Sequence, residues 1–139
     1  MTIAPAFDAT TRTLPRPQFA DFSVARQLWE SIGCAAIAGA ITGWALGTNL
    51  WLYLATAGMA AVAGVPAATQ HSKLRDALVR TALGGFLWAL AVLGIYLGRG
   101  EHAVMPLPDP LWLYLVTTTL PATAVGWLVW AWTNRLSRG

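Results

Sequence analysis

A run of 42 residues without Asp, Glu, Lys or Arg, from Ser31 to Ser72, constrains this chain more than any other feature. As one straight helix the run would be roughly 63 Å long, about twice the thickness of the hydrocarbon core of a bilayer. It must therefore turn back on itself, and Gly47–Asn49 is the turn-like break near its middle. The run predicts two membrane-spanning helices, over about 30–47 and 50–69.

The composition of the whole chain extends this prediction. Of its 139 residues, 56% are apolar and only 11% are charged, whereas a soluble domain carries about 25% charged residues. Two further apolar stretches, about 77–98 and 111–132, are each long enough to cross a bilayer. The sequence therefore predicts an all-α polytopic membrane protein. We expect four transmembrane helices, arranged as two hairpins within residues 21–139, after a flexible N-terminal tail over residues 1–20.

Small residues recur at every fourth position along the first predicted span. On a helix this spacing forms a stripe with almost no side chain, and such a stripe lets two helix backbones pack closely in lipid. The core of the stripe is Gly39-x-x-x-Gly43-x-x-x-Gly47. We expect glycine-zipper packing of this helix through Ser31, Ala35, Gly39, Gly43 and Gly47.

The basic residues indicate the topology. Eight of the nine lie on one side of a four-span arrangement, and Arg99 alone lies on the other. Because cytoplasmic loops carry an excess of Lys and Arg, both termini would face the cytoplasm in a bacterial membrane. The eight residues are Arg12, Arg16, Arg26, Lys73, Arg75, Arg80, Arg135 and Arg138.

Two pairs of residues interrupt the plain apolar pattern of the spans. Asp76 and Arg80 are four residues apart with the acid first, the favourable order for an ion pair on a helix, so we expect them to anchor the third span near the headgroups. Pro66 and Pro121 each remove a backbone hydrogen bond and predict kinks, and hydroxyls of Thr117–Thr119 could satisfy the backbone near Pro121. The functional alternative to a packing bend at Pro121 is one wall of a narrow polar path.

The sequence predicts no chemical site. No ionisable residue lies at mid-depth of a span, where coupled transport and proton relays need one. His71 and His102 fall in loops on opposite faces and cannot share one haem iron, and the single Cys34 excludes an intramolecular disulfide and a cysteine-based metal cluster. No Ser/His/Asp arrangement, phosphate-binding loop or nucleic-acid groove is visible. We therefore expect no enzyme activity, cofactor, metal or nucleic-acid partner.

The middle of the chain resembles a known family. The stretch GAITGWALGT at 39–48 and the charged turn Ser72–Asp76, which leads into a helix with the pair Gly84-Gly85, resemble the mitochondrial inner-membrane translocase family of preprotein and amino-acid transporter type. The similarity covers about residues 31–98 and is greatest to the accessory membrane subunit of respiratory complex I in that family. The resemblance implies four spans, helix packing through Gly84 and Gly85, and a place in the mitochondrial inner membrane.

Three classes of function follow. The small-residue stripes, the absence of buried charge and the family resemblance favour a non-catalytic integral subunit that stabilises or helps to assemble a larger inner-membrane respiratory complex of the complex I type. Its partners would be membrane lipids and other integral membrane subunits. The alternative is a small membrane transporter, a translocase-type conduit or a lipid-linked flippase, in a mitochondrial or a bacterial inner membrane. A membrane enzyme is the third class, and it lacks any convergent polar site.

Overall fold

The computed structural model describes residues 17–100 and 102–136. Residues 1–16, most of the predicted tail, lie outside the described residues. All regular elements in the described residues are helical, so the predicted all-α class is confirmed. In chain order they are a 3-10 turn (Phe19–Asp21), α1 (Val24–Leu28), a π-helical segment (Trp29–Gly33), α2 (Cys34–Leu46), α3 (Leu50–Thr69), α4 (Leu74–Arg99) and α5 (Trp112–Leu136).

Local sequence signals set the ends of these helices. The hydroxyl of Ser23 accepts a hydrogen bond from the backbone N–H of Arg26 at 3.3 Å and caps α1. The side chain of Asn49 accepts from the backbone N–H of Trp51 at 2.8 Å and caps α3, which places the turn between α2 and α3 where the sequence predicts it. Gly100 adopts a left-handed conformation with φ of 64° and ends α4.

Three helices, α3, α4 and α5, are long and apolar enough to cross a membrane. The expected span over 30–47 is not among them, because its α-helical part, α2, has only 13 residues, whereas a crossing helix needs about 17–25. A π-helical segment, Trp29–Gly33, lies directly before α2 and widens the helix there. The structure therefore supports a helical membrane protein with three candidate spans, where the sequence predicts four.

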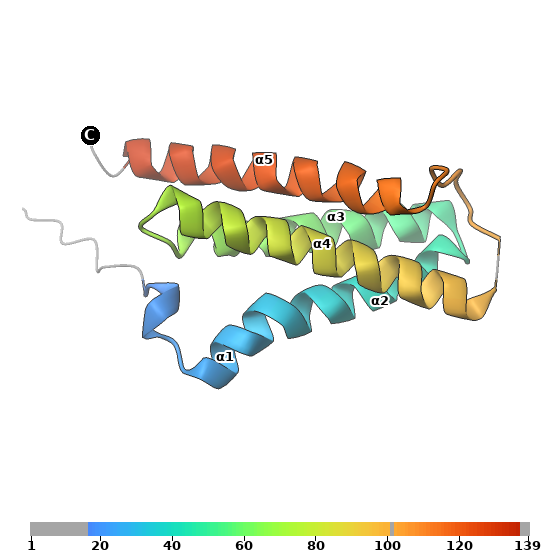
Figure 1. Ribbon diagram of the computed structural model, residues 1–139, viewed down its shortest axis with the longest axis horizontal. Coiled ribbons are helices and arrows are strands. Elements are labelled where there is room, and N and C mark those ends of the chain that lie inside the picture. Colours follow the sequence, from blue (N-terminus) through green and yellow to red (C-terminus); the bar gives the residue numbers. More distant parts are fainter. Residues whose placement is uncertain (1–16, 101, 137–139) are drawn as a thin grey trace, which may run out of the picture.

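The long helices alternate in direction (Figure 1). At one end of the bundle, here called the terminal end, lie α1, the turn 70–73 between α3 and α4, and the last turn of α5. At the other end, the loop end, lie the turn 47–49 and the segment 102–111. Helix α4 packs along both α2 and α5, and α3 contacts each of the other three long helices.

Glycines allow α2 and α4 to pack backbone to backbone. A Cβ atom added at Gly39 would collide with the carbonyl oxygen of Trp88, and one added at Gly43 would lie 2.9 Å from the Cα atom of Val92. Both glycines are buried. The α2–α4 contact therefore depends on the absence of side chains at these two positions.

The contact between α4 and α5 follows the same principle. A Cβ atom at Gly126 would lie 2.5 Å from the Oγ1 atom of Thr81, and one at Gly85 would lie 2.8 Å from the Cβ atom of Ala122. Gly84, in contrast, has nothing within 4 Å of its added Cβ position. Of the predicted pair Gly84-Gly85, Gly85 alone meets the neighbouring helix closely.

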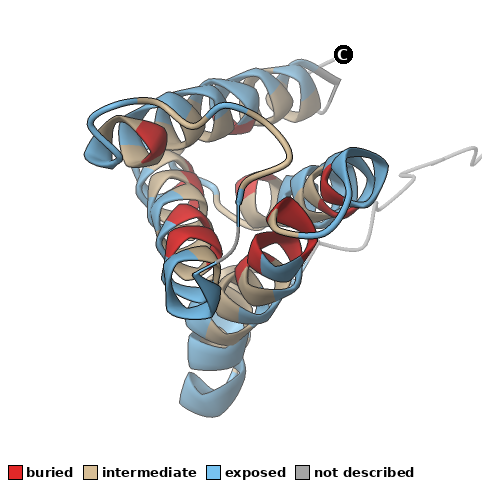
Figure 2. Cartoon of the chain, turned by 90° about the vertical axis from the view of Figure 1, so that its right-hand side faces the viewer, coloured by how far each residue is buried: buried red, intermediate tan, exposed pale blue. Residues whose placement is uncertain are grey.

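The cluster of buried hydrophobic residues lies toward the loop end. The phenolic oxygens of Tyr53 and Tyr114 are 3.1 Å apart and join α3 to α5, and the backbone N–H of Val104 donates to the carbonyl of Leu46 at 2.9 Å. Figure 2, which looks at the bundle from this end, shows the buried residues where helices face one another and an exposed outer surface. The buried cluster consists of Ala45, Leu46, Tyr53, Ala89, Val92, Leu93 and Tyr114.

Both internal prolines lie within continuous helices. Helix α3 continues past Pro66 and α5 continues past Pro121. The hydroxyls of Thr117 and Thr118 donate to carbonyls one turn earlier, including that of Tyr114, and not to the backbone next to Pro121 as we expected. Pro121 leaves the carbonyl of Thr117 without its helical donor. A threonine hydroxyl on a helix reaches the carbonyls three and four residues before it, so the hydroxyl of Thr117 cannot reach this carbonyl.

The α2–α4 contact leads to a stability prediction. Gly43→Ala should lower the free energy of unfolding in mild detergent by about 1–3 kcal/mol, because the added Cβ forces the two backbones apart. Gly94→Ala is the matched control on α4: nothing lies within 4 Å of its Cβ position, and the better helix propensity of Ala should be neutral or stabilising. Equal unfolding free energies for the two variants would contradict this account of the packing.

Candidate functional site

The four long helices line a partly open cavity of about 630 Å³ in the terminal half of the bundle. Alanine and glycine predominate among its lining residues, and they come from α2, α3, α4 and α5. Small side chains leave space wherever the helix backbones are not in direct contact, so the cavity follows from this composition. We call it the interhelical cavity.

One end of the cavity lies toward the loop end. Trp88, Thr117 and Thr118 line it there, and Trp88 also packs against the buried Tyr53–Tyr114 cluster. At its opposite end the cavity reaches Glu30, Gln70 and Arg80. Glu30 and Arg80 are the charged residues among the described lining residues, so the cavity has one polar end and otherwise mainly apolar walls.

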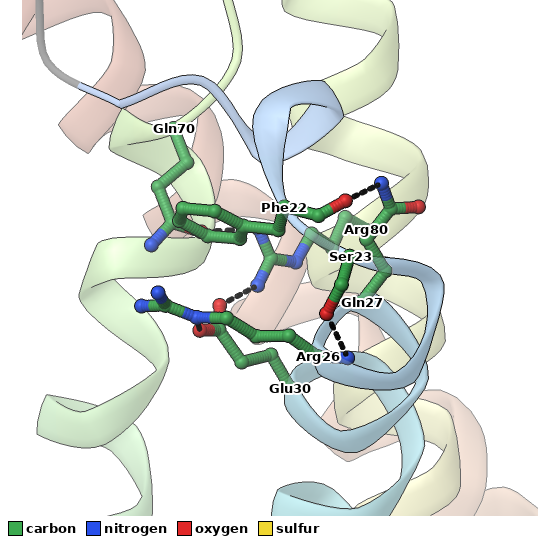
Figure 3. A network of polar contacts seen from close by, with 7 residues as sticks. All are labelled: Phe22, Ser23, Arg26, Gln27, Glu30, Gln70 and Arg80. Atoms are coloured by element: carbon green, nitrogen blue, oxygen red, sulfur yellow. Dashed lines mark hydrogen bonds and ion pairs between the residues drawn. The ribbon is translucent and has the colours of Figure 1, made fainter.

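Arg80 is the centre of this polar end. Its side chain is only 9% exposed. Its Nη1 atom donates to the Oε1 atom of Gln70, and its Nη2 atom donates to Glu30 Oε2 at 3.1 Å. The Nε atom of Arg26 donates to the other carboxylate oxygen of Glu30 at 2.8 Å. We call Arg26, Glu30, Gln70 and Arg80 the Arg80 cluster; Figure 3 shows its side chains converging between the first helical segment and the end of α3.

The π-helical segment carries Glu30, the residue that joins the two arginines. A π-bulge inserts extra backbone into a helix and re-aims the side chains on it, and such bulges are frequent at functional sites. Replacing Glu30 would leave the buried guanidinium of Arg80 without its only ion-pair partner among the described residues.

The segment before α1 covers the outer side of Arg80. The ring of Phe19 lies 3.9 Å from the guanidinium carbon of Arg80, and the backbone N–H of Phe19 donates to the carbonyl of Gln70 at 3.0 Å. The side chain of Gln27 donates to the carbonyl of Phe22 at 2.9 Å and holds the segment against α1. Phe19 falls within the predicted flexible tail 1–20, but these contacts make Phe19 part of the folded structure.

His71 completes the wall around Phe19. Its ring lies 5.3 Å from that of Phe19, and its carbonyl accepts a hydrogen bond from the indole of Trp130 on α5 at 3.1 Å. Burial of the imidazole, reinforced by the positive charge of Arg80, lowers the pKa of His71 below its usual value. His71 is therefore held in its neutral form at the α3–α4 turn.

Four buried polar atoms have no hydrogen-bond partner in the described part of the chain: Arg80 Nε, Trp88 Nε1, His71 Nε2 and Thr119 Oγ1. Two of these residues, Arg80 and Trp88, line the interhelical cavity at its opposite ends. Buried donors without acceptors are rare in folded proteins and cost about 1–3 kcal/mol each. A residue with an unused donor therefore lies at each end of the cavity.

The structure assigns Arg80 a different partner from the one predicted. The sequence predicts an ion pair between Asp76 and Arg80, whereas Arg80 pairs with Glu30. Asp76 is exposed and Arg80 lies in the interior. A partner inside the bundle gains more from a low dielectric than an exposed neighbour on the same helix does. No sequence signal identifies Glu30, because it lies 50 residues before Arg80.

The other predicted residues divide between the cavity and the helix contacts. Gly39 and Gly43 lie in the α2–α4 contact, and Gly47 begins the turn after α2. The remaining predicted residues all line the cavity: Ser31, Ala35, Pro66, Gly84, Gly85 and Pro121. Among the residues that the structure describes, no group of three His, Cys, Asp or Glu side chains is placed to hold a metal ion.

Comparisons with known proteins identify no relative. No family model matches the chain, and neither a curated protein nor a solved structure matches it significantly. The resemblance to the translocase family therefore stays a prediction from the sequence.

The pairing of Arg80 leads to a second prediction. Glu30→Ala should lower the free energy of unfolding by about 1–3 kcal/mol, because it leaves a buried guanidinium without its carboxylate. Asp76→Ala removes an exposed carboxylate from the same end of the bundle and should change it by less than about 1 kcal/mol. Denaturant unfolding of the protein in detergent measures the unfolding free energy of both variants. A larger loss for Asp76→Ala than for Glu30→Ala would contradict the pairing of Arg80 with Glu30 and favour its pairing with Asp76.

Proposed function

We propose that this chain is a small membrane protein that binds a lipid or a similar amphiphile inside its helical bundle, as a carrier or flippase does. The interhelical cavity of about 630 Å³ is the observation that carries this proposal. Its volume falls within the range of about 300–1,000 Å³ that small-molecule sites occupy, and its mainly apolar walls with a few convergent polar groups are typical of such sites.

The cavity is partly open at the surface of the bundle, where residues of α3 that line it, such as Gly64 and Val65, are exposed. A chain or ring from the surrounding membrane is the material at hand to fill an apolar space between membrane helices.

Residues that the sequence singles out for other reasons support the carrier class. Pro121, Thr117 and Thr118 form part of the cavity wall on α5, as the polar-path interpretation of this segment requires. The accessory-subunit interpretation, with a respiratory complex as partner, rests on the small-residue stripes, the family resemblance and the absence of buried charge, and the buried side chain of Arg80 weakens the last of these.

The same proposal includes four membrane crossings. The helical run from Val24 to Leu46 is continuous through the π-helical segment and is roughly 34 Å long, enough to reach across a hydrocarbon core of about 30 Å. It would be the fourth crossing, held to α4 by a short glycine zipper at Gly39 and Gly43. The two ends of the described chain lie at the same end of the bundle (Figure 1), which agrees with the distribution of Lys and Arg.

Filling the cavity tests the proposed function. Gly84 lines the cavity and has nothing within 4 Å of its Cβ position, so Gly84→Leu can place its side chain in the open space without a backbone collision. Binding of an uncharged probe, dodecyl glucoside, to the full chain in nanodiscs should weaken about tenfold or more in this variant. The protein should remain folded, which its thermal transition measures.

Gly94→Leu provides the matched control. Gly94 lies on the same helix, has equally open space at its Cβ position and is not part of the cavity. It should bind the probe as the unmodified chain does. Equal binding to both variants, or no binding beyond that of empty nanodiscs, would contradict the proposed function.

A further inference from the structure

We propose that the Arg80 cluster binds the anionic head of the amphiphile, a phosphate or a carboxylate, while the tail lies along the apolar walls of the interhelical cavity. This inference rests on the proposed function and adds to it the chemistry and the orientation of the ligand. Arg80 makes the direct contact, and Glu30 and Gln70 hold its guanidinium in place.

The first argument is the hydrogen-bonding capacity of Arg80. A guanidinium carries five N–H donors. Gln70 accepts one and Glu30 accepts one, and the Nε atom has no partner although it is buried. The side chain is more than nine-tenths buried and lines the cavity. A ligand oxygen at this end would satisfy donors that the protein itself leaves unused, and phosphate and carboxylate oxygens suit a guanidinium best.

The second argument is charge. The Arg80 cluster holds two guanidinium groups and one carboxylate, so it carries one excess positive charge. An anionic head compensates this charge, whereas a cationic head would add to it. Arg26 binds Glu30 from the outer side, where its side chain is 59% exposed, so the carboxylate is engaged on both oxygens and is a poor acceptor for a ligand cation.

The third argument is the shape of the cavity. On α4 its wall passes from Arg80 through Gly84 to Trp88, two turns and roughly 12 Å away. Glycine and alanine on the facing helices leave this length open. A head at Arg80 therefore directs a hydrocarbon tail toward the opposite end, where Trp88 packs against the core.

Probes that share one tail and differ in the head test the inference. Dodecyl phosphate, dodecyltrimethylammonium and dodecyl glucoside are each measured against the full chain in nanodiscs of zwitterionic lipid, and inorganic phosphate is measured alone. Dodecyl phosphate should bind about tenfold or more tightly than the glucoside. The ammonium probe should bind less tightly than the glucoside. Inorganic phosphate should not bind measurably, because it lacks the tail.

Two substitutions link the preference to the cluster. Arg80→Gln should abolish the preference for phosphate over glucoside, whereas Arg135→Gln, which removes an exposed charge from the end of α5, should leave it unchanged. Glu30→Gln keeps an oxygen that can accept from Arg80 and so holds the guanidinium in place, and it removes the negative charge that repels an anionic head, so affinity for dodecyl phosphate should rise several-fold. A gain in affinity cannot result from unfolding.

The outcomes separate this inference from the proposed function. Equal binding of the three dodecyl probes, or tighter binding of the ammonium probe, overturns the anionic head and leaves the cavity proposal intact. Lower affinity for dodecyl phosphate in Glu30→Gln also overturns it. Tight binding of inorganic phosphate alone would mean that the site takes a free anion and not an amphiphile. If no dodecyl probe binds, both proposals fail.

Discussion

The contact between α2 and α4 at Gly39 and Gly43 determines the shape of the bundle. Two backbones meet there because neither glycine has a side chain, and the buried cluster around Val92 and Leu93 continues that contact toward the loop end. Toward the terminal end the facing residues, Ser31 on one side and Arg80 on the other, line an open space. The two helices touch at Gly39 and Gly43 and separate toward the terminal end, and the space between them there forms part of the cavity.

Small residues have two opposite consequences in this chain. At Gly126 the missing side chain admits Thr81 of α4, and the helices touch. At Gly64 and Gly84 nothing fills the position, and the result is cavity wall. A small residue permits a close approach of backbones and does not enforce it, since the larger side chains nearby decide whether the helices close.

The sequence contains enough information for the helices but not for the site. The charge-free run from Ser31 to Ser72 and the turn-like break at Gly47–Asn49 predict α3 and its start, and Gly39 and Gly43 are found by their spacing. The π-helical segment and the resulting length of α2 have no comparable signal, which is why three candidate spans replace the four expected. Sequence rules consider neighbours on the same helix and therefore predict that Arg80 pairs with Asp76. The fold instead brings Glu30 to Arg80 from 50 residues away.

The segment around Phe19 shows the same limit. A proline-containing stretch with mixed polar residues predicts a tail, yet Phe19 lies on the guanidinium of Arg80 and on His71. Its contribution becomes visible only once α4 presents a buried cation, because an aromatic ring over a desolvated guanidinium is worth about 2 kcal/mol or more. The buried Arg80 thus contacts two parts of the structure. It lines the cavity on its inner side, and the N-terminal segment with Phe19 covers its outer side.

The central claim is that the interhelical cavity holds an amphiphile in the membrane. Native mass spectrometry of the full chain, released directly from the membranes in which it is made, tests this most directly. We expect one bound amphiphile of defined mass on the unmodified chain and on Gly94→Leu, and none on Gly84→Leu. A chain that leaves the membrane without a bound molecule, or a Gly84→Leu variant that retains the same one, would contradict the account.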